Sequence, residues 1–177
     1  MVDTQLSRCI HQSGEDDLPL NSINPIVIFY ADNFTEDEMT RKDMSLFQMA
    51  KCASELSDFS SRKSKKLGCV VVIKHRIVSS GCNSNKTSPI QQKYNSLRFD
   101  ADTPHKIHAE TAALKPLIGN KEIDLTKASL YIYRELRNGK PGLARPCPSC
   151  MQLIKDLGIR YIHYTTDDGY AEEEVVY

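Results

Sequence analysis

The chain of 177 residues suits one domain that buries a core without disulfides. Its 23 basic and 23 acidic residues give a formal net charge of zero, which excludes an overall field that would draw the protein to nucleic acid or to a membrane surface. Apolar runs too short to span a bilayer, and six cysteines without an apolar N-terminal signal segment, predict a cytoplasmic protein with no membrane partner.

We expect an N-terminal extension at residues 1–38 and one domain at residues 39–177. The run from Pro25 to Tyr30 is rich in β-branched and aromatic residues, so it is compatible with an added edge strand or an extended arm. Thr35 and Glu38 form a capping-box pattern that predicts the start of the first helix. Apolar residues at helical spacing then predict its core-facing side: Met44, Phe47, Met49, Cys52, Ala53 and Leu56.

A basic run from Arg62 to Lys66 is typical of a solvated loop, although its cations also suit phosphates at the mouth of a site. Two β-branched runs follow at residues 67–73 and 76–82, and Lys74-His75 between them predicts a hairpin. Asn83 comes directly after the second strand, a position where asparagine is common in ordinary turns.

A polar stretch at residues 84–106 is predicted to be a long loop that leads to His108. Its cations and aromatic rings suit a nucleotide, through charge contacts and stacking. The alternative, a surface loop anchored by Tyr94 and Phe99, is equally compatible with the sequence.

Two helices are predicted at residues 107–117 and 147–157, with a strand at residues 129–133 between them. A further strand at residues 159–164 precedes the turn signal Asp167-Asp168-Gly169. This turn predicts that residues 173–177 return as an antiparallel last strand.

The starts of the two helices carry three candidate metal ligands. Cys147 and Cys150 are three apart, so both thiolates lie on one face of a helix and can reach one ion. With the imidazole of His108 they make three protein ligands and leave a fourth tetrahedral position for water, as in catalytic zinc sites. Glu110 lies two residues from His108 and faces elsewhere on the helix, which suits proton transfer better than ligation. A Cys-x-x-Cys pair alone is also typical of a structural zinc half-site or a redox motif.

The combination of His108-Ala109-Glu110 with Pro146-Cys147-Pro148-Ser149-Cys150 resembles the signature of the cytidine and deoxycytidylate deaminase superfamily, over roughly residues 40–177. The resemblance implies one Zn²⁺ per chain on His108, Cys147 and Cys150, with Glu110 as the catalytic proton shuttle. It also implies that the backbone N–H of Ala109 donates a hydrogen bond to the base carbonyl. By the same resemblance, Asn83 of the Gly81-Cys82-Asn83 sequence contacts the sugar.

The fold class implied is α/β: a three-layer α/β/α sandwich with a mixed five-stranded sheet whose last strand is antiparallel. The chain departs from the family between Arg134 and Arg145, where most relatives pass to the Pro-Cys motif within a few residues. This insertion is a candidate for substrate selectivity, through Arg134, Arg137, Lys140 or Arg145.

The expected reaction is hydrolytic deamination of cytosine to uracil, on a nucleotide of the dCMP or CMP kind or on single-stranded nucleic acid. Three alternatives stay open. They are an adenosine deaminase acting on tRNA or polynucleotides, a deaminase of a small molecule such as a nucleoside or guanine, and a non-catalytic nucleic-acid-binding module stabilised by zinc. Nucleotide deaminases of this fold often assemble, so a homo-oligomer is compatible with the resemblance.

Overall fold

The computed structural model describes residues 32–34, 39–58, 65–96 and 105–176. Its main sheet has six strands in the order β1-β8-β7-β6-β2-β3, and β4 and β5 form a separate pair. The strands are β1 (Asp32–Phe34), β2 (Lys66–Ile73), β3 (Arg76–Cys82), β4 (Ser84–Thr87), β5 (Lys106–Ile107), β6 (Ala128–Glu135), β7 (Tyr161–Thr165) and β8 (Tyr170–Glu174). The helices are α1 (Arg41–Glu55), α2 (Pro89–Asn95), α3 (Ala109–Leu114), the 3₁₀-helix at Leu125–Lys127 and α4 (Pro148–Asp156).

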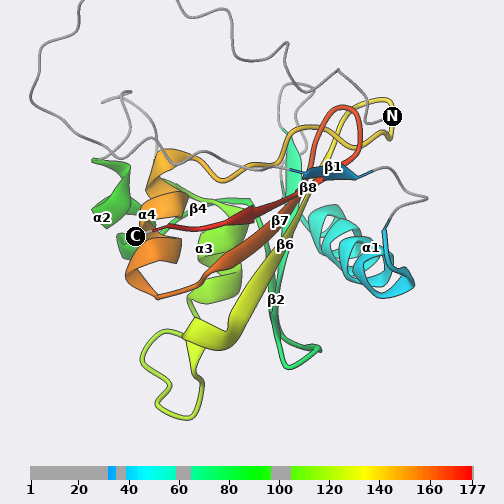
Figure 1. Ribbon diagram of the computed structural model, residues 1–177. Coiled ribbons are helices and arrows are strands. Elements are labelled where there is room, and N and C mark those ends of the chain that lie inside the picture. The colour runs from blue at the N-terminus through cyan, green and yellow to red at the C-terminus, as the bar shows by residue number, and fades with distance from the viewer. Residues whose placement is uncertain (1–31, 35–38, 59–64, 97–104, 177) are drawn as a thin grey trace, which may run out of the picture.

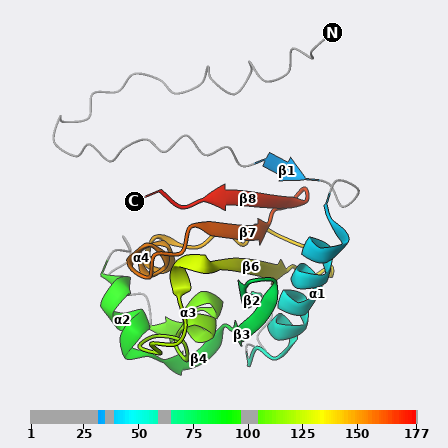
Figure 2. The same ribbon diagram turned by 60° about the horizontal axis from the view of Figure 1, so that its bottom comes forward.

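The sheet forms the middle layer of a three-layer sandwich, with α1 on one face and α3 and α4 on the other (Figures 1 and 2). Strands β6 and β7 are parallel, and the other neighbouring pairs of the main sheet are antiparallel. The predicted mixed sheet with an antiparallel last strand is therefore confirmed. Strand β1 adds a sixth strand at the edge beside β8. The run at residues 25–30 that was considered for an edge strand lies outside the described residues.

Strand β2 is an interior strand of the sheet, and its side chains pack against the helices on both faces. Cys69 and Val71 point into the core beneath α3 and α4, whereas Val70 and Val72 pack under α1. This alternation follows from the two-residue period of a strand. The turn from β2 to β3 is the predicted one, and Lys74 and His75 both adopt positive φ values, as a two-residue hairpin turn requires.

Two glycines let helices approach the sheet closely. A Cβ atom on Gly68 would lie 2.0 Å from the carbonyl oxygen of Ala50, so α1 packs directly on β2 at this point. A Cβ atom on Gly81 would lie 2.4 Å from the backbone nitrogen of Ala113 in α3. The helix that follows His108 therefore rests on the backbone of β3.

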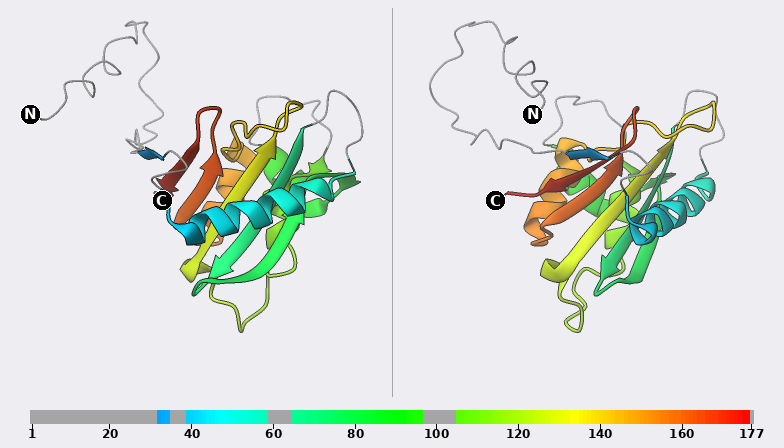
Figure 3. Two further views of the ribbon diagram at one scale, coloured as in Figure 1. Left: turned by 90° about the vertical axis from the view of Figure 1, so that its right-hand side faces the viewer. Right: turned by 45° about the vertical axis from the view of Figure 1, so that its right-hand side comes forward.

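Helix α1 differs from its prediction at both ends. It begins after Thr40, whose hydroxyl accepts a hydrogen bond from the N–H of Asp43, whereas Thr35 and Glu38 lie outside the described residues. Met49, Cys52 and Leu56 were predicted to face the core but are exposed, Met49 to 47% and Leu56 to 80%, and Figure 3 shows α1 crossing the outer face of the sheet. The buried side of α1 includes Phe47, Ala50 and Ala53.

Other boundaries are also shifted. The stretch at residues 84–106 is not wholly a loop, because it contains β4, α2 and the first residue of β5. The last strand ends at Glu174, earlier than the predicted 173–177. None of the described helices has the length and apolar character needed to cross a membrane.

Candidate metal centre

His108, Cys147 and Cys150 meet where two helices begin. His108 is the N-cap of α3, while Cys147 is the N-cap of α4 and Cys150 lies in its first turn. The sulfur atoms of Cys147 and Cys150 each lie 3.4 Å from Nδ1 of His108. Among the described residues these three form the group of side chains that could hold a metal ion, with all ligand atoms within 4.8 Å of one another.

The distances fit zinc. Bonds of about 2.3 Å to sulfur and about 2.0 Å to nitrogen, at a tetrahedral angle, separate the two ligand atoms by about 3.5 Å. The observed 3.4 Å agrees with this value for both thiols. Two thiolates and one imidazole are also the donor atoms that zinc prefers, and three protein ligands leave one position open.

The two thiols are electrostatically coupled. Hydrogen bonding with Cys150, and then with His108, lowers the pKa of Cys147 to about 3. The same contact with Cys147, together with burial, raises the pKa of Cys150 well above its usual value. The two thiols therefore titrate as a coupled pair, and a metal ion that binds both as thiolates would release the protons that they hold.

Glu110 lies in the first turn of α3 and is only 3% exposed. Burial raises the pKa of its carboxyl group, and His108, Cys147 and Cys150 are near enough to affect it further. Its Oε2 atom is buried and has no hydrogen-bond partner among the described residues. Such an orphaned oxygen is rare in a folded protein and points to a role with water or a ligand.

A comparison with protein families agrees with this geometry. The model of the cytidine and deoxycytidylate deaminase zinc-binding region matches residues 40–166. The chain belongs to the cytidine and deoxycytidylate deaminase family. It is therefore a zinc-dependent deaminase, a hydrolase acting on C–N bonds, and one zinc ion per chain is its cofactor.

Solved structures of the same fold include cytidine deaminase from Burkholderia pseudomallei and dCMP deaminase from the cyanophage S-TIM5 in apo form. The first is 18% identical, with a TM-score of 0.53, and the match covers 77% of this chain and 94% of that one. The second is 20% identical, with a TM-score of 0.50, and the match covers 72% and 86%. No curated protein matches the sequence significantly.

The two residues carried over for substrate contacts occupy different surroundings. Ala109 is fully buried and begins α3, where N–H groups have no partner within the helix. Asn83 instead ties neighbouring segments together. Its Oδ1 accepts hydrogen bonds from the backbone of Leu67 and the hydroxyl of Ser57, both at 2.9 Å, and its Nδ2 donates to the carbonyl of Lys65 at 2.7 Å. Among the described residues, the second amide hydrogen of Asn83 has no acceptor that would compete with a sugar, and the sugar contact stays a prediction.

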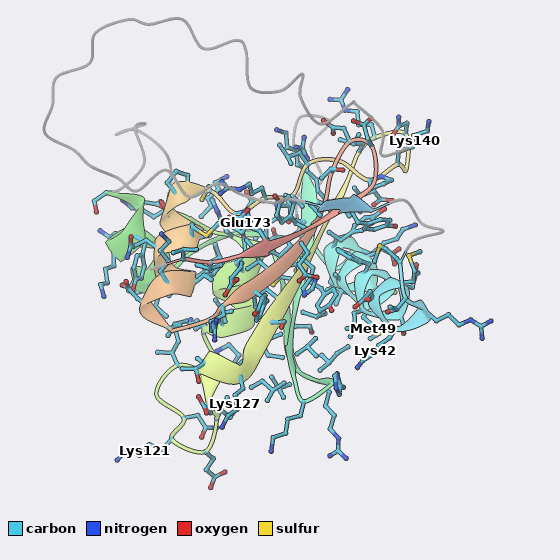
Figure 4. All side chains as sticks on the ribbon, in the orientation of Figure 1. Lys42, Met49, Lys121, Lys127, Lys140 and Glu173 are labelled. Atoms are coloured by element: carbon cyan, nitrogen blue, oxygen red, sulfur yellow. The ribbon has the colours of Figure 1, made fainter. Side chains whose placement is uncertain are left out.

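The insertion from Arg134 to Arg145 lies beside the turn between β7 and β8, where the N–H of Leu143 donates to the side chain of Asp167 (Figure 1). Arg134 donates to the carbonyl oxygen of Leu143, and Arg145 forms two hydrogen bonds with the carboxylate of Glu173. Arg137 and Lys140 are exposed, and Figure 4 places Lys140 at the far end of this insertion. Two of the four cations considered for selectivity are thus engaged within the protein.

Sequence reasoning missed Gln91 and Thr111, which contact the metal-binding segment. Gln91 Oε1 accepts hydrogen bonds from the backbone N–H of His108 at 3.2 Å and from the hydroxyl of Thr111 at 2.7 Å. A signal for α2 was present, because Ser88 followed by Pro89 is a typical helix start. Nothing in the sequence pointed to the partners of Gln91.

Proposed function

We propose that this deaminase converts cytosine to uracil on a free nucleotide of the dCMP or CMP kind. The observation that carries this proposal is the buried carboxyl of Glu110, with one oxygen unpaired among the described residues, beside three zinc-compatible ligand atoms. The reaction consumes one water molecule, forms a carbonyl at C4 of the ring and releases ammonia.

In this proposal His108, through Nδ1, and the thiolates of Cys147 and Cys150 bind the zinc ion. When bound at such a site, zinc lowers the pKa of a coordinated water toward about 7 and supplies a nucleophile near neutral pH. The chain's own contribution is a fixed position for that water, next to a general base.

Glu110 is that general base. Its buried carboxylate takes a proton from the attacking water and passes it to N3 of the ring, and then a proton reaches the departing amine. Because burial raises its pKa, the carboxyl group holds a proton more readily than an exposed glutamate would. The N–H of Ala109 donates to the carbonyl of the base, and Asn83 contacts the sugar.

A free nucleotide is favoured over a nucleic-acid strand on two grounds. The S-TIM5 enzyme has been solved in complex with dCMP and dUMP, and that structure, 19% identical with a TM-score of 0.50, has the same fold. The chain also carries no net positive charge that would favour a polymer. Single-stranded nucleic acid is the second candidate, because Arg137 and Lys140 are exposed on the insertion.

Ammonia release by the zinc-loaded protein tests the proposal. We expect turnover of dCMP or CMP, with kcat about 10²- to 10⁴-fold lower in Glu110→Gln at unchanged zinc content. Turnover of cytosine-containing DNA or RNA strands alone would overturn the free-nucleotide assignment. Turnover only of adenosine in tRNA, or only of nucleosides or guanine, would support those alternatives instead. Zinc binding without any turnover, in wild type and Glu110→Gln alike, would support the non-catalytic module.

A further inference from the structure

Helix α2 contacts both of the helices that carry the proposed metal ligands. Gln91 bonds to α3 at His108 and Thr111, as described above. One turn further along α2, the hydroxyl of Tyr94 donates to the carboxylate of Asp156 at 2.7 Å, at the end of α4. A single short helix is thereby bonded to α3 at the metal ligand His108 and to α4 at the end opposite Cys147 and Cys150, and Figure 2 shows α2 beside both helices.

The amide of Gln91 is held at both of its ends. Gln91 is 1% exposed, and while its oxygen accepts the two bonds from α3, its Nε2 donates to Oδ1 of Asn95 at 2.8 Å. The amide nitrogen of Asn95 lies 3.1 Å from Nδ1 of His105, which precedes β5. The buried chain of hydrogen bonds therefore runs from the segment before His108, through α2, and back to His108 itself. In a buried network of this kind, each lost bond leaves another group unsatisfied.

The two bonds from α3 restrict the position of the metal ligand. His108 has an extended backbone as the N-cap residue, and its N–H donates to the side chain of Gln91. Thr111 lies three residues later, on the adjacent turn of the helix surface. Fixing α3 at both points sets where the helix begins and how it is rotated about its axis, and so where the imidazole of His108 lies.

We propose that Gln91 is a positioning residue for the zinc site. Gln91 fixes the start of α3, and Tyr94 attaches the same helix α2 to the end of α4, so that His108 lies where it can bind one ion with Cys147 and Cys150 before that ion arrives. This inference rests on the metal ligands assigned under the proposed function. It gives α2 a role in forming the metal site.

The test is a matched pair of substitutions on α2. Gln91→Leu removes the buried amide at similar side-chain size, and Gln92→Leu makes the same change at the exposed neighbouring position. Zinc affinity is measured by chelator competition, and the geometry of the site by the visible spectrum of the cobalt-substituted protein. We expect Gln91→Leu to weaken zinc binding about 10- to 100-fold and to alter the cobalt spectrum, as found for residues that orient metal ligands. Gln92→Leu should change neither.

Asn95→Leu provides a second, milder variant, because it removes the acceptor of the Gln91 amide nitrogen and leaves both bonds from α3 in place. It should weaken zinc binding less than Gln91→Leu, and it decides the matter if Gln91→Leu does not fold. The inference is overturned if the folded Gln91→Leu variant, or Asn95→Leu in its place, binds zinc and gives a cobalt spectrum indistinguishable from Gln92→Leu. His108→Ala separates the two proposals. If this variant binds zinc as tightly as wild type, the ligand assignment itself has failed, whatever Gln91→Leu shows.

Discussion

Glu110 illustrates a conflict between stability and activity within one side chain. Burial of the Glu110 carboxyl group disfavours its ionised form, because an ionised group loses hydration on burial, and one of its oxygens has no partner among the described residues. Glu110→Gln keeps the shape and removes the charge. We therefore expect the metal-free variant to unfold at a higher temperature than the metal-free wild type at neutral pH, although it lacks activity. Calorimetry of both proteins, stripped of zinc, measures this. An equal or lower unfolding temperature would contradict the buried, unpaired state of Glu110.

His163 is predicted to make the protein sensitive to acid. Its ring stacks on Tyr131 at 4.1 Å, with Asp43 of α1 nearby and Glu172 of β8 at 3.5 Å, and burial lowers its pKa to about 4. The unfolded chain binds a proton at His163 below about pH 6.5, whereas the folded protein does so only near pH 4. The free energy of unfolding should thus fall as the pH drops through this window, by about 2 kcal/mol at pH 5.

Urea unfolding at pH 7.5 and pH 5 measures this loss. His163→Phe keeps an aromatic ring against Tyr131 but cannot be protonated, so its stability should change less over the same range. The lowered pKa of Asp43 acts in a lower window, below about pH 4, and does not interfere. If His163→Phe loses as much stability as wild type between pH 7.5 and pH 5, the acid sensitivity arises from groups other than His163.

At the scale of single residues, the metal ligands and Glu110 could be proposed from sequence because their spacing is dictated by the chemistry. His-x-Glu and Cys-x-x-Cys fix residues close together along the chain, and that spacing is visible without a structure. Gln91 and Glu173 could not be found this way. Gln91 acts through His108 and Thr111, and Glu173 through Arg145, all of them distant in the sequence, and neither type of residue is rare enough to attract notice.

The ion pair between Arg145 and Glu173 connects the last strand to the segment that leads into α4. Glu173 lies on the face of β8 toward α4 (Figure 4), and its side chain is 1% exposed, whereas that of Arg145 is 37% exposed. Tyr164 adds a third hydrogen bond to the same carboxylate at 3.2 Å. Because Arg145 is two residues before Cys147, this pair also anchors the start of the metal-binding helix.

The unequal burial of the two partners predicts unequal effects of mutation. Arg145→Met leaves the Glu173 carboxylate charged and buried, so it should lower the free energy of unfolding by about 3–5 kcal/mol. Glu173→Gln leaves a guanidinium that still reaches water, so the loss should be about 1–2 kcal/mol. Combining Arg145→Met with Glu173→Leu should recover much of the stability, since a buried pair can be replaced by apolar groups. Urea unfolding of the set tests this order, and a larger loss for Glu173→Gln would contradict it.

At the scale of elements, turn residues with a strong conformational preference predicted the hairpins correctly, whereas short or incomplete apolar patterns did not predict the helices correctly. The hairpin at Lys74-His75 and the return after Asp167-Asp168-Gly169 follow from turn chemistry, and both turns are present. Helix α2 was missed because seven residues hold too few periods to reveal a buried side. The exposure of Met49 and Leu56 could not be predicted either. Apolar residues at helical spacing indicate an apolar side of the helix, but they do not show how much of that side the sheet covers.

For the whole molecule, the family resemblance predicted the three layers and the mixed sheet. It did not predict the sixth strand, β1, at the edge of the sheet. Strand β1 belongs to the proposed N-terminal extension, yet it completes the edge of the main sheet by pairing Asp32 with Glu172 and Phe34 with Tyr170. No pattern in the sequence specifies that pairing, because a three-residue strand has almost no periodicity. The boundary between residues 38 and 39 stays a prediction.

Deletion of residues 1–38 tests that boundary against a matched control that lacks only residues 1–31 and keeps β1. We expect both proteins to fold and to bind one zinc ion, because α1 and all proposed ligands lie beyond residue 38. The longer deletion exposes the edge of β8, so it should lose about 2–3 kcal/mol of stability from the missing strand pairing and self-associate more readily. Urea unfolding, zinc content and size-exclusion chromatography measure the three effects. Failure of the longer deletion alone to fold would move the domain boundary upstream of β1, and equal stability of the two proteins would show that β1 contributes nothing to the fold.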